Sequence, residues 1–277
     1  MQRSHIVLLG FIGPFREEGI VKILFMGRKL SSANLLEWSL NKGHEIVGVL
    51  TDSHLVNSPT AKMAKKYGID IYSIEEIYEK IKNNQIEIDL AISVVYWKKI
   101  KEPLISFPKF GTINLHPAPL PDYKGTAGYN MAILDGLDEW AITAHYVNQY
   151  IDEGEIIKKF IFSIDPESET VTSLEKTSQI FIESLYKNII NLVSKGGILK
   201  STKNSGGRYI SREEMESMKK VREGDDVDLK IRAFWFPPYL GAYIYLNEKK
   251  YTLISNDILM SLAPKHETNL FAKKIDA

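Results

Sequence analysis

The sequence contains no cysteine among its 277 residues. This absence excludes disulfides, thiolate metal ligands and cysteine nucleophiles at once. Histidine is scarce as well, with six residues in all, and these do not follow the short spacings of metal ligands. We therefore expect no bound metal.

An excess of either charge is also missing, because 35 lysines and arginines balance 35 aspartates and glutamates. Proteins that bind nucleic acid usually carry a basic excess, so the composition predicts no nucleic-acid partner. The apolar run at residues 6–13 is too short to span a bilayer. Acidic Glu17 and Glu18 follow it, where a signal peptide would place small residues. We expect a cytoplasmic protein without a membrane partner.

From residue 21 onward, short apolar runs alternate with helical patterns. The expected strands cover residues 21–26, 45–50, 69–72, 88–95 and 111–116. Between them, Ser31 and Ser32 offer N-caps for a helix through Leu40, and a second helix over 60–67 stops at Gly68. This alternation is typical of an α/β fold with a doubly wound, mostly parallel sheet.

The pattern of expected helices and strands changes in the second half of the chain. A helix is expected over 127–134, then strands over 141–147 and 155–164. The pattern Thr172-x-x-Glu175 predicts a capping box that opens a long helix ending near Ser194. Past residue 200 come a short helix after Ser211 and an aromatic segment over 231–251. We predict an N-terminal extension (1–20), a main domain (21–200) and a small C-terminal α+β subdomain (201–277).

Three polar side chains interrupt segments that otherwise read as buried strand and tight turn: Asn114, His116 and Asp152. Asn114 and His116 are two residues apart in an extended run, so their side chains point to the same face. A proline-rich turn follows directly and places both at the carboxyl end of the strand. Open α/β sheets bind their ligands at that end.

These residue types suit acyl transfer to an external nucleophile. A neutral histidine can accept or donate a proton near neutral pH, and an amide can stabilise a developing oxyanion without changing its charge. A carboxylate beside the histidine would orient the ring and help to accept a proton. Spacing alone leaves a second interpretation open, a capped strand end with a structural histidine.

The motif Asn114-x-His116, the turn through Tyr123-Lys124-Gly125, and Asp152-x-Gly154 with two following isoleucines resemble the signature of the folate-dependent formyltransferases. The resemblance covers about residues 21–193 and implies a Rossmann-like fold. It also implies N10-formyltetrahydrofolate as formyl donor and no metal. Asn114 and His116 would then polarise the formyl oxygen, and Asp152 would support the histidine and help to take the proton from the attacking amine.

The resemblance also suggests which residues bind the substrates. Backbone groups of Val94, Val95 and Tyr96 would line the pterin pocket, with a plain strand end as the alternative. Tyr123 and Gly125 would shape the opposite wall.

Two further residues are assigned to substrate binding, and one histidine is not. Lys124 would meet a phosphate or the folate tail, unless it is simply solvated, and Trp97 is placed on the substrate side. His145, on an apolar strand, is interpreted as a structural histidine.

Members of the family differ in the amine that they formylate. The glycinamide ribonucleotide enzyme would end near the long helix, whereas this chain continues for about eighty residues. Methionyl-tRNA formyltransferase carries a basic insertion after the second strand, but Thr51–Pro59 here contains no lysine or arginine, and cations dominate binding to a phosphate backbone.

The remaining branch that the sequence resembles is the sugar-nucleotide N-formyltransferases. These act on dTDP- or UDP-linked amino sugars for surface polysaccharides such as the O-antigen of lipopolysaccharide. A methionyl-tRNA formyltransferase, a formyltetrahydrofolate hydrolase and a non-catalytic folate-binding domain remain alternatives. The aromatic C-terminal segment suggests core packing and a possible homodimer contact.

Overall fold

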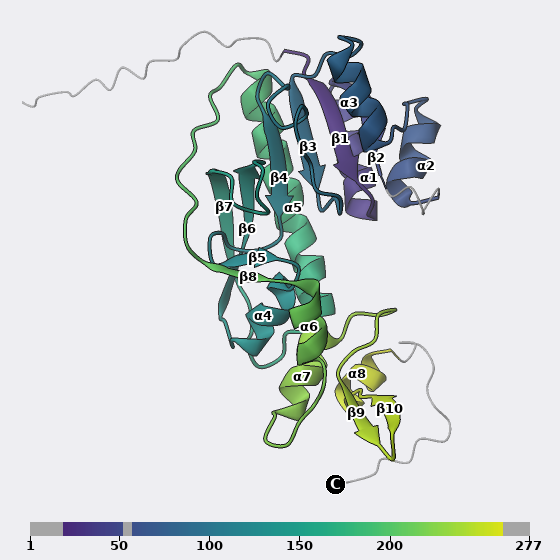
Figure 1. Cartoon of the computed structure of the whole chain (residues 1–277), viewed down its shortest axis with the longest axis vertical. Coiled ribbons are helices and arrows are strands. Elements are labelled where there is room, and N and C mark those ends of the chain that lie inside the picture. The colour runs from purple at the N-terminus through teal and green to yellow at the C-terminus, as the bar shows by residue number, and fades with distance from the viewer. Residues whose placement is uncertain (1–18, 52–56, 263–277) are drawn as a thin grey trace, which may run out of the picture. The chain divides into compact units, whose positions relative to one another are not determined.

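The computed structural model describes residues 19–51 and 57–262 (Figure 1). By its internal contacts the chain forms two compact units whose sequences interleave. The first contains the residues up to Asn114 together with Glu183–Ser201, and the second contains Leu115–Ile182 and the residues from Thr202 onward. Residues 1–18 of the expected extension lie outside the described residues. The predicted boundaries at 20 and 200 stay predictions.

A mixed six-stranded sheet in the order β2-β1-β3-β4-β6-β7 forms the framework of the α/β fold. Its strands are β1 (Lys22–Gly27), β2 (Glu45–Leu50), β3 (Leu90–Val94), β4 (Thr112–His116), β6 (Glu139–Tyr146) and β7 (Ile156–Ser163). β1 pairs in parallel with both β2 and β3, whereas β6 and β7 pair antiparallel. The predicted α/β class with a central sheet is confirmed. The apolar runs of β1 and β3 are buried throughout except at Lys22, as expected for strands covered on both faces.

The helices of the first unit are α1 (Leu30–Asn41), α2 (Pro59–Lys66) and α3 (Ile74–Lys82). The predicted caps of α1 are wrong: the N-cap is Lys29, which makes no side-chain cap bond, and Ser32 lies buried inside the helix. α2 agrees with its prediction and is capped by Ser58, with proline at its first turn.

The strand expected over residues 69–72 is not formed. A single bridge joins Val49 to Ile71, and the chain then enters α3. The sequence pattern had not indicated this helix, although Ser73-x-x-Glu76 forms a complete capping box at its start. Ile74, Ile77 and Ile81 bury one face of α3, and this burial stabilises so short a helix.

The second unit contains α4 (Gly128–Leu134), and the long helix α5 (Val171–Ser194) runs from this unit into the first. The capping box predicted at Thr172 is misplaced by two residues. Thr170 Oγ1 accepts from the Ser173 backbone N–H, and Thr172 instead donates its hydroxyl to the Trp235 carbonyl oxygen. On α5, Leu174, Leu185 and Ile189 are buried, whereas Ile180 and Leu192 are exposed.

Past residue 200 the chain forms β8 (Arg208–Ile210), α6 (Arg212–Met218), α7 (Val227–Phe234), the hairpin β9 (Tyr243–Leu246) and β10 (Lys249–Thr252), and α8 (Asn256–Ser261). Ser211 caps α6 as the sequence indicated. β8 does not join the hairpin: it pairs in parallel with β5 (Tyr123–Gly125), as Figure 1 shows. The rings of Tyr243 and Tyr245 meet edge to face at 5.7 Å, on one face of the hairpin. A homodimer through this region stays a prediction.

Candidate active site

The amide of Asn114 is oriented from the end of the neighbouring strand. Ser93 on β3 donates its hydroxyl to Asn114 Oδ1 at 2.7 Å, and Ser93 is buried. Because the carbonyl oxygen of the amide is engaged by Ser93, the two hydrogens on Nδ2 point away from that contact. The bond from Ser93 therefore fixes the orientation of the Asn114 amide.

His116 is the last residue of β4, two positions after Asn114. The predicted strand and its end are thus confirmed, and the pleat puts both side chains on the same face. The His116 ring is buried, and its Nε2 lies 2.8 Å from the backbone carbonyl oxygen of Tyr123. A carbonyl oxygen can only accept, so Nε2 carries a hydrogen. The other ring nitrogen, Nδ1, lies 3.6 Å from Oδ2 of Asp152.

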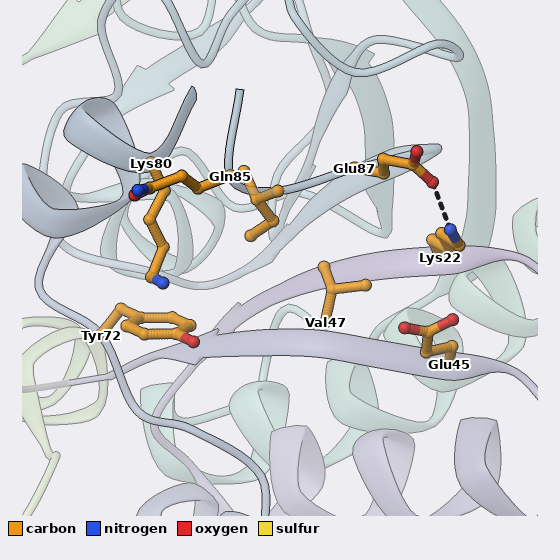
Figure 2. A pocket seen from close by; sticks show the side chains of 8 residues that line it. Lys22, Glu45, Val47, Tyr72, Lys80, Gln85 and Glu87 are labelled. Carbon is orange, nitrogen blue, oxygen red and sulfur yellow. Dashed lines mark hydrogen bonds and ion pairs between the residues drawn. The ribbon is translucent and has the colours of Figure 1, made fainter. Parts of the chain in front are cut away.

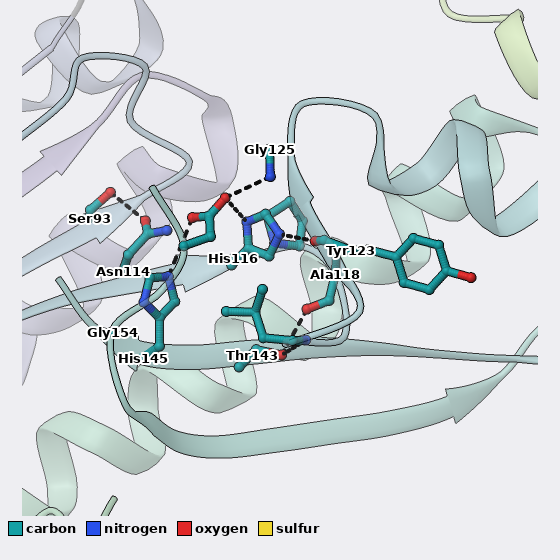
Figure 3. A network of polar contacts seen from close by, with 12 residues as sticks. Ser93, Asn114, His116, Ala118, Tyr123, Gly125, Thr143, His145 and Gly154 are labelled. Atoms are coloured by element: carbon teal, nitrogen blue, oxygen red, sulfur yellow. Dashed lines mark hydrogen bonds and ion pairs between the residues drawn. The ribbon is translucent and has the colours of Figure 1, made fainter. Parts of the chain in front are cut away.

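Asp152 lies in the loop between β6 and β7, and its carboxylate is close to both His116 and His145, the two rings labelled in Figure 3. Oδ2 accepts a hydrogen bond of 2.9 Å from the Gly125 backbone N–H. Oδ1 lies 3.5 Å from Nε2 of His145. The structure thus brings His116 and Asp152 together as the sequence predicted.

His145 is the residue whose place the sequence interpretation missed. Its Nδ1 donates to the Tyr146 carbonyl oxygen at 2.7 Å, so its Nε2 is the atom that faces Asp152. The rings of His116 and His145 are 6.3 Å apart and nearly perpendicular. The available signal was its position next to the end of β6, directly before the loop that carries Asp152.

The surroundings fix the charges of this cluster. Burial lowers the pKa of His116, and the nearby His145 lowers it further, although Asp152 and the Tyr123 carbonyl act in the opposite direction. Burial tends to raise the pKa of Asp152, but His116, the hydrogen bonds from His145 and Gly125, and the charge of His145 together lower it to about 2. At neutral pH, Asp152 is therefore ionised and His116 is neutral.

The proline-rich turn after β4 is held by buried side chains of β6. Thr143 donates its hydroxyl to the Ala118 carbonyl oxygen at 2.7 Å and accepts from the Leu120 N–H at 3.1 Å. Trp140 Nε1 donates to the Pro117 carbonyl oxygen at 3.0 Å. These bonds fix the segment that leads from His116 to β5, and so fix the carbonyl to which His116 is bound.

The segment predicted to meet the pterin begins at the end of β3. Val94 is buried, whereas Trp97 is 47% exposed. Val95 has a φ of 55°, a rare conformation for a β-branched residue that clusters at functional sites. The contact of this segment with a pterin stays a prediction.

β5 carries the other predicted binding residues. Tyr123 donates its hydroxyl to Asp135 at 2.9 Å. Lys124 is buried, and its Nζ lies 3.4 Å from Oε1 of Glu153, so the alternative of a solvated lysine is wrong. Gly125 has a φ of 88°, and a Cβ there would lie 2.4 Å from the Ile210 carbonyl oxygen, which explains why glycine occupies this position.

A separate hollow of about 270 Å³ lies at the amino ends of β1 and β2 (Figure 2). Its lining includes Lys22, Glu45, Val47, Tyr72, Lys80 and Glu87. Lys22 and Glu87 form an ion pair there. This is the end of the parallel strands opposite to the one where α/β sheets bind ligands, so we assign it no role.

Within residues 19–51 and 57–262, no group of three potential ligands is arranged to hold a metal ion. None of the helices in those ranges is long and apolar enough to cross a membrane. The expectations of no metal and no membrane partner stay predictions.

The family model for formyl transferases matches residues 22–190. The chain belongs to the formyl transferase family. The match covers β1 through nearly all of α5. Asn114, His116 and Asp152 of this formyltransferase therefore lie within the region that the family model matches.

Individual relatives point to two kinds of formyl acceptor. The methionyl-tRNA formyltransferase of Listeria innocua is 28% identical over 249 residues, which cover 84% of this chain and 78% of that protein. WlaRD, a sugar 3N-formyl transferase solved in the presence of dTDP and 5-N-formyl-THF, is 26% identical with a TM-score of 0.69, covering 83% of this chain and 84% of that one. A 4-N formyltransferase from Francisella tularensis, 18% identical with a TM-score of 0.70 over 84% and 96% of the two chains, shares the fold.

Proposed function

We propose that this formyltransferase transfers the formyl group of N10-formyltetrahydrofolate to the amino group of a dTDP- or UDP-linked sugar. The observation that carries the proposal is the carboxylate of Asp152 facing the buried ring of His116, which ends the strand on which Asn114 also lies. The polar contacts of His116 within the described residues are with the Tyr123 carbonyl oxygen and with Asp152. In this proposal the amine of the acceptor is itself the nucleophile.

Each residue has a distinct task in this reaction. The amine attacks the formyl carbon, and Asn114 donates a hydrogen bond as negative charge develops on the formyl oxygen. His116, neutral at pH 7, and ionised Asp152 accept the proton that the amine loses. The bond between the formyl carbon and N10 then breaks, and N10 takes up a proton as tetrahydrofolate leaves.

Several features support a sugar nucleotide as acceptor. The net charge is zero, and the sequence Thr51–Pro59 after β2 contains no lysine or arginine, although residues 52–56 lie outside the described ones. A tRNA would need clustered cations to hold its phosphates. The sugar 3N-formyl transferase WlaRD, solved in the presence of dTDP, matches most of the length of both chains.

The donor and acceptor pockets follow from the predicted residues. We assign Val94, Val95, Tyr96, Tyr123 and Gly125 to binding of the pterin, and Trp97 and Lys124 to binding of the acceptor. The ion pair with Glu153 fixes the position of the Lys124 ammonium group, and a phosphate of the acceptor would take the place of the glutamate. Lys124→Met is expected to raise the KM for the sugar nucleotide about 10-fold or more, in line with the loss of one charge-assisted hydrogen bond.

The deciding experiment follows the release of tetrahydrofolate from N10-formyltetrahydrofolate with three kinds of acceptor. We expect turnover with at least one amino sugar linked to dTDP or UDP, and none with initiator methionyl-tRNA or with buffer alone. The Asn114→Ala variant serves as the control for reaction at this site.

A methionyl-tRNA formyltransferase is the second candidate, favoured by the name of the relative from Listeria innocua. Turnover with the charged tRNA and with no amino sugar would replace our proposal by this one. Release of tetrahydrofolate with no acceptor at all would identify a hydrolase, and no release under any condition would favour a non-catalytic domain.

A further inference from the structure

Asp152 has an unusual backbone for a residue with a chemical role. Its φ is +55°, in the left-handed region that residues other than glycine, asparagine and aspartate rarely adopt. Two residues later, a Cβ on Gly154 would lie 1.7 Å from the Tyr146 carbonyl oxygen. The loop is therefore folded tightly against the end of β6, and the direction of the carboxylate depends on this fold being kept.

One side chain from a distant part of the sequence holds this loop. Nδ2 of Asn204 donates to the carbonyl oxygens of both Asp152 and Gly154, each at 2.9 Å. These partners are 52 and 50 residues away along the chain. Thr202, just before Asn204, exchanges backbone hydrogen bonds of 2.9 and 2.8 Å with Ile156, which fixes the position of the amide.

The amide oxygen of Asn204 differs from its nitrogen in having no hydrogen-bond partner within the described residues. This Oδ1 atom is buried. A buried acceptor without a partner is unfavourable for folding. The contribution of Asn204 therefore lies in its two N–H donors, both of which are directed at the Asp152 loop.

We propose that Asn204 is a positioning residue for formyl transfer: by bridging the Asp152 and Gly154 carbonyls it keeps Asp152 left-handed, with its carboxylate between His116 and His145. This inference rests on the proposed function for its catalytic meaning. Its structural content, the alignment of one carboxylate with two imidazoles, can be measured without any substrate.

The test follows the pH titration of the His116 and His145 rings by NMR in the full chain, with signals assigned from His116→Gln and His145→Gln. In Asn204→Ala the carboxylate is no longer held near His116, so the His116 midpoint falls, by about half a pH unit or more. In the Asn204→Ala background, the further change Asp152→Asn should then shift the His116 midpoint much less than Asp152→Asn shifts it in the otherwise wild-type protein. A matched control is Asn148→Ala, which removes a bond to the Tyr150 N–H in the same loop.

The kinetic readout separates positioning from folding. With the acceptor found for the wild type, Asn204→Ala is expected to lower kcat about 10-fold or more while the KM values change less than about threefold, as for loss of an aligned catalytic group. Asn204→Ser retains one donor and should recover part of both kcat and the His116 midpoint. It also provides the measurement if Asn204→Ala does not fold.

The outcomes distinguish this inference from the proposed function. Unchanged histidine titration and unchanged kcat in a folded Asn204→Ala or Asn204→Ser would overturn the positioning role, even with a fully active wild type. Shifted titration in a protein that formylates no sugar would support the alignment and contradict the proposed function alone.

Discussion

His116 and Asp152 face each other across 3.6 Å, from Nδ1 to Oδ2, while the opposite nitrogen of His116 is bound to the Tyr123 carbonyl oxygen. Nε2 of His116 therefore keeps its hydrogen, and Nδ1 is the ring nitrogen that can accept and release a proton. A proton that reaches Nδ1 arrives beside an ionised carboxylate. The pair is therefore built to receive one proton and to hold it as a cation beside an anion.

Replacing Asn114 tests the oxyanion role. Asn114→Ala should lower kcat about 10²–10³-fold, because one preorganised donor is lost, and should leave the protein folded, although it removes the acceptor of the Ser93 hydroxyl. Steady-state kinetics and thermal unfolding check both parts. Asn188→Ala, at an exposed asparagine of α5, is the matched control and should keep full activity. Full activity in Asn114→Ala would show that the oxygen is stabilised by other groups.

The pH dependence of activity should reflect the buried histidine. Because the pKa of His116 lies below its ordinary value of 6.5, the acid limb of kcat/KM should have its midpoint below pH 6.5. Asp152 raises that pKa, so Asp152→Asn should move the limb to still lower pH and reduce the rate about 10²–10⁴-fold. The profile of Asp257→Asn, an exposed change on α8, should match the wild type. An acid limb that stays in place in Asp152→Asn would argue against His116 as its source.

Stability should fall at acid pH in two steps. The folded state holds the pKa of His116 below 6.5. The contribution of neutral His116 to the free energy of unfolding is therefore complete above pH 6.5, and it is lost as the pH falls toward the lowered pKa. Asp152, with a pKa of about 2 against 3.8, contributes roughly 2 kcal/mol above pH 4 that is lost between about pH 4 and 2. Urea unfolding from pH 7.5 to 2 measures both steps, and His116→Gln should remove the first one. A stability that is constant from pH 7 to 5 would contradict the first step.

Gly125 provides a test of the close approach between β5 and β8. Gly125→Ala should lower the free energy of unfolding by about 1–3 kcal/mol, since it combines a left-handed φ with a backbone collision. It should also reduce kcat, because the Gly125 N–H is bonded to Asp152. Gly136→Ala, with a φ of +61° and open space around the new methyl, is the control for φ alone and should cost about 1 kcal/mol. Equal losses in the two variants would mean that the collision is relieved elsewhere.

Local patterns were sufficient to predict much of this fold. β1, β2, α2 and α4 were indicated by apolar periodicity and turn residues, which act over a few positions. The same holds for Asn114 and His116, which share one strand. The short helix α3 was missed because it follows an apolar stretch that resembles a strand, although its capping box was visible in the sequence.

Contacts between distant parts of the sequence could not be predicted in this way. His145 lies seven positions before Asp152, and the relation depends on how the loop folds back. The donors of Asn204 reach across 50 and 52 residues. No periodicity in one sequence indicates such a pairing.

The pairing of β8 with β5 determines where this enzyme can be joined to a relative in a chimera. The strand that carries Tyr123 and Gly125 has its partner at Arg208–Ile210, and the Asp152 loop is tied to Asn204. A chimera joined at residue 200 to change the acceptor would exchange these supports along with the C-terminal region. Recombination after Ile210 would keep both supports native, so a change in activity could be assigned to the exchanged residues and not to a disturbed Asp152 loop.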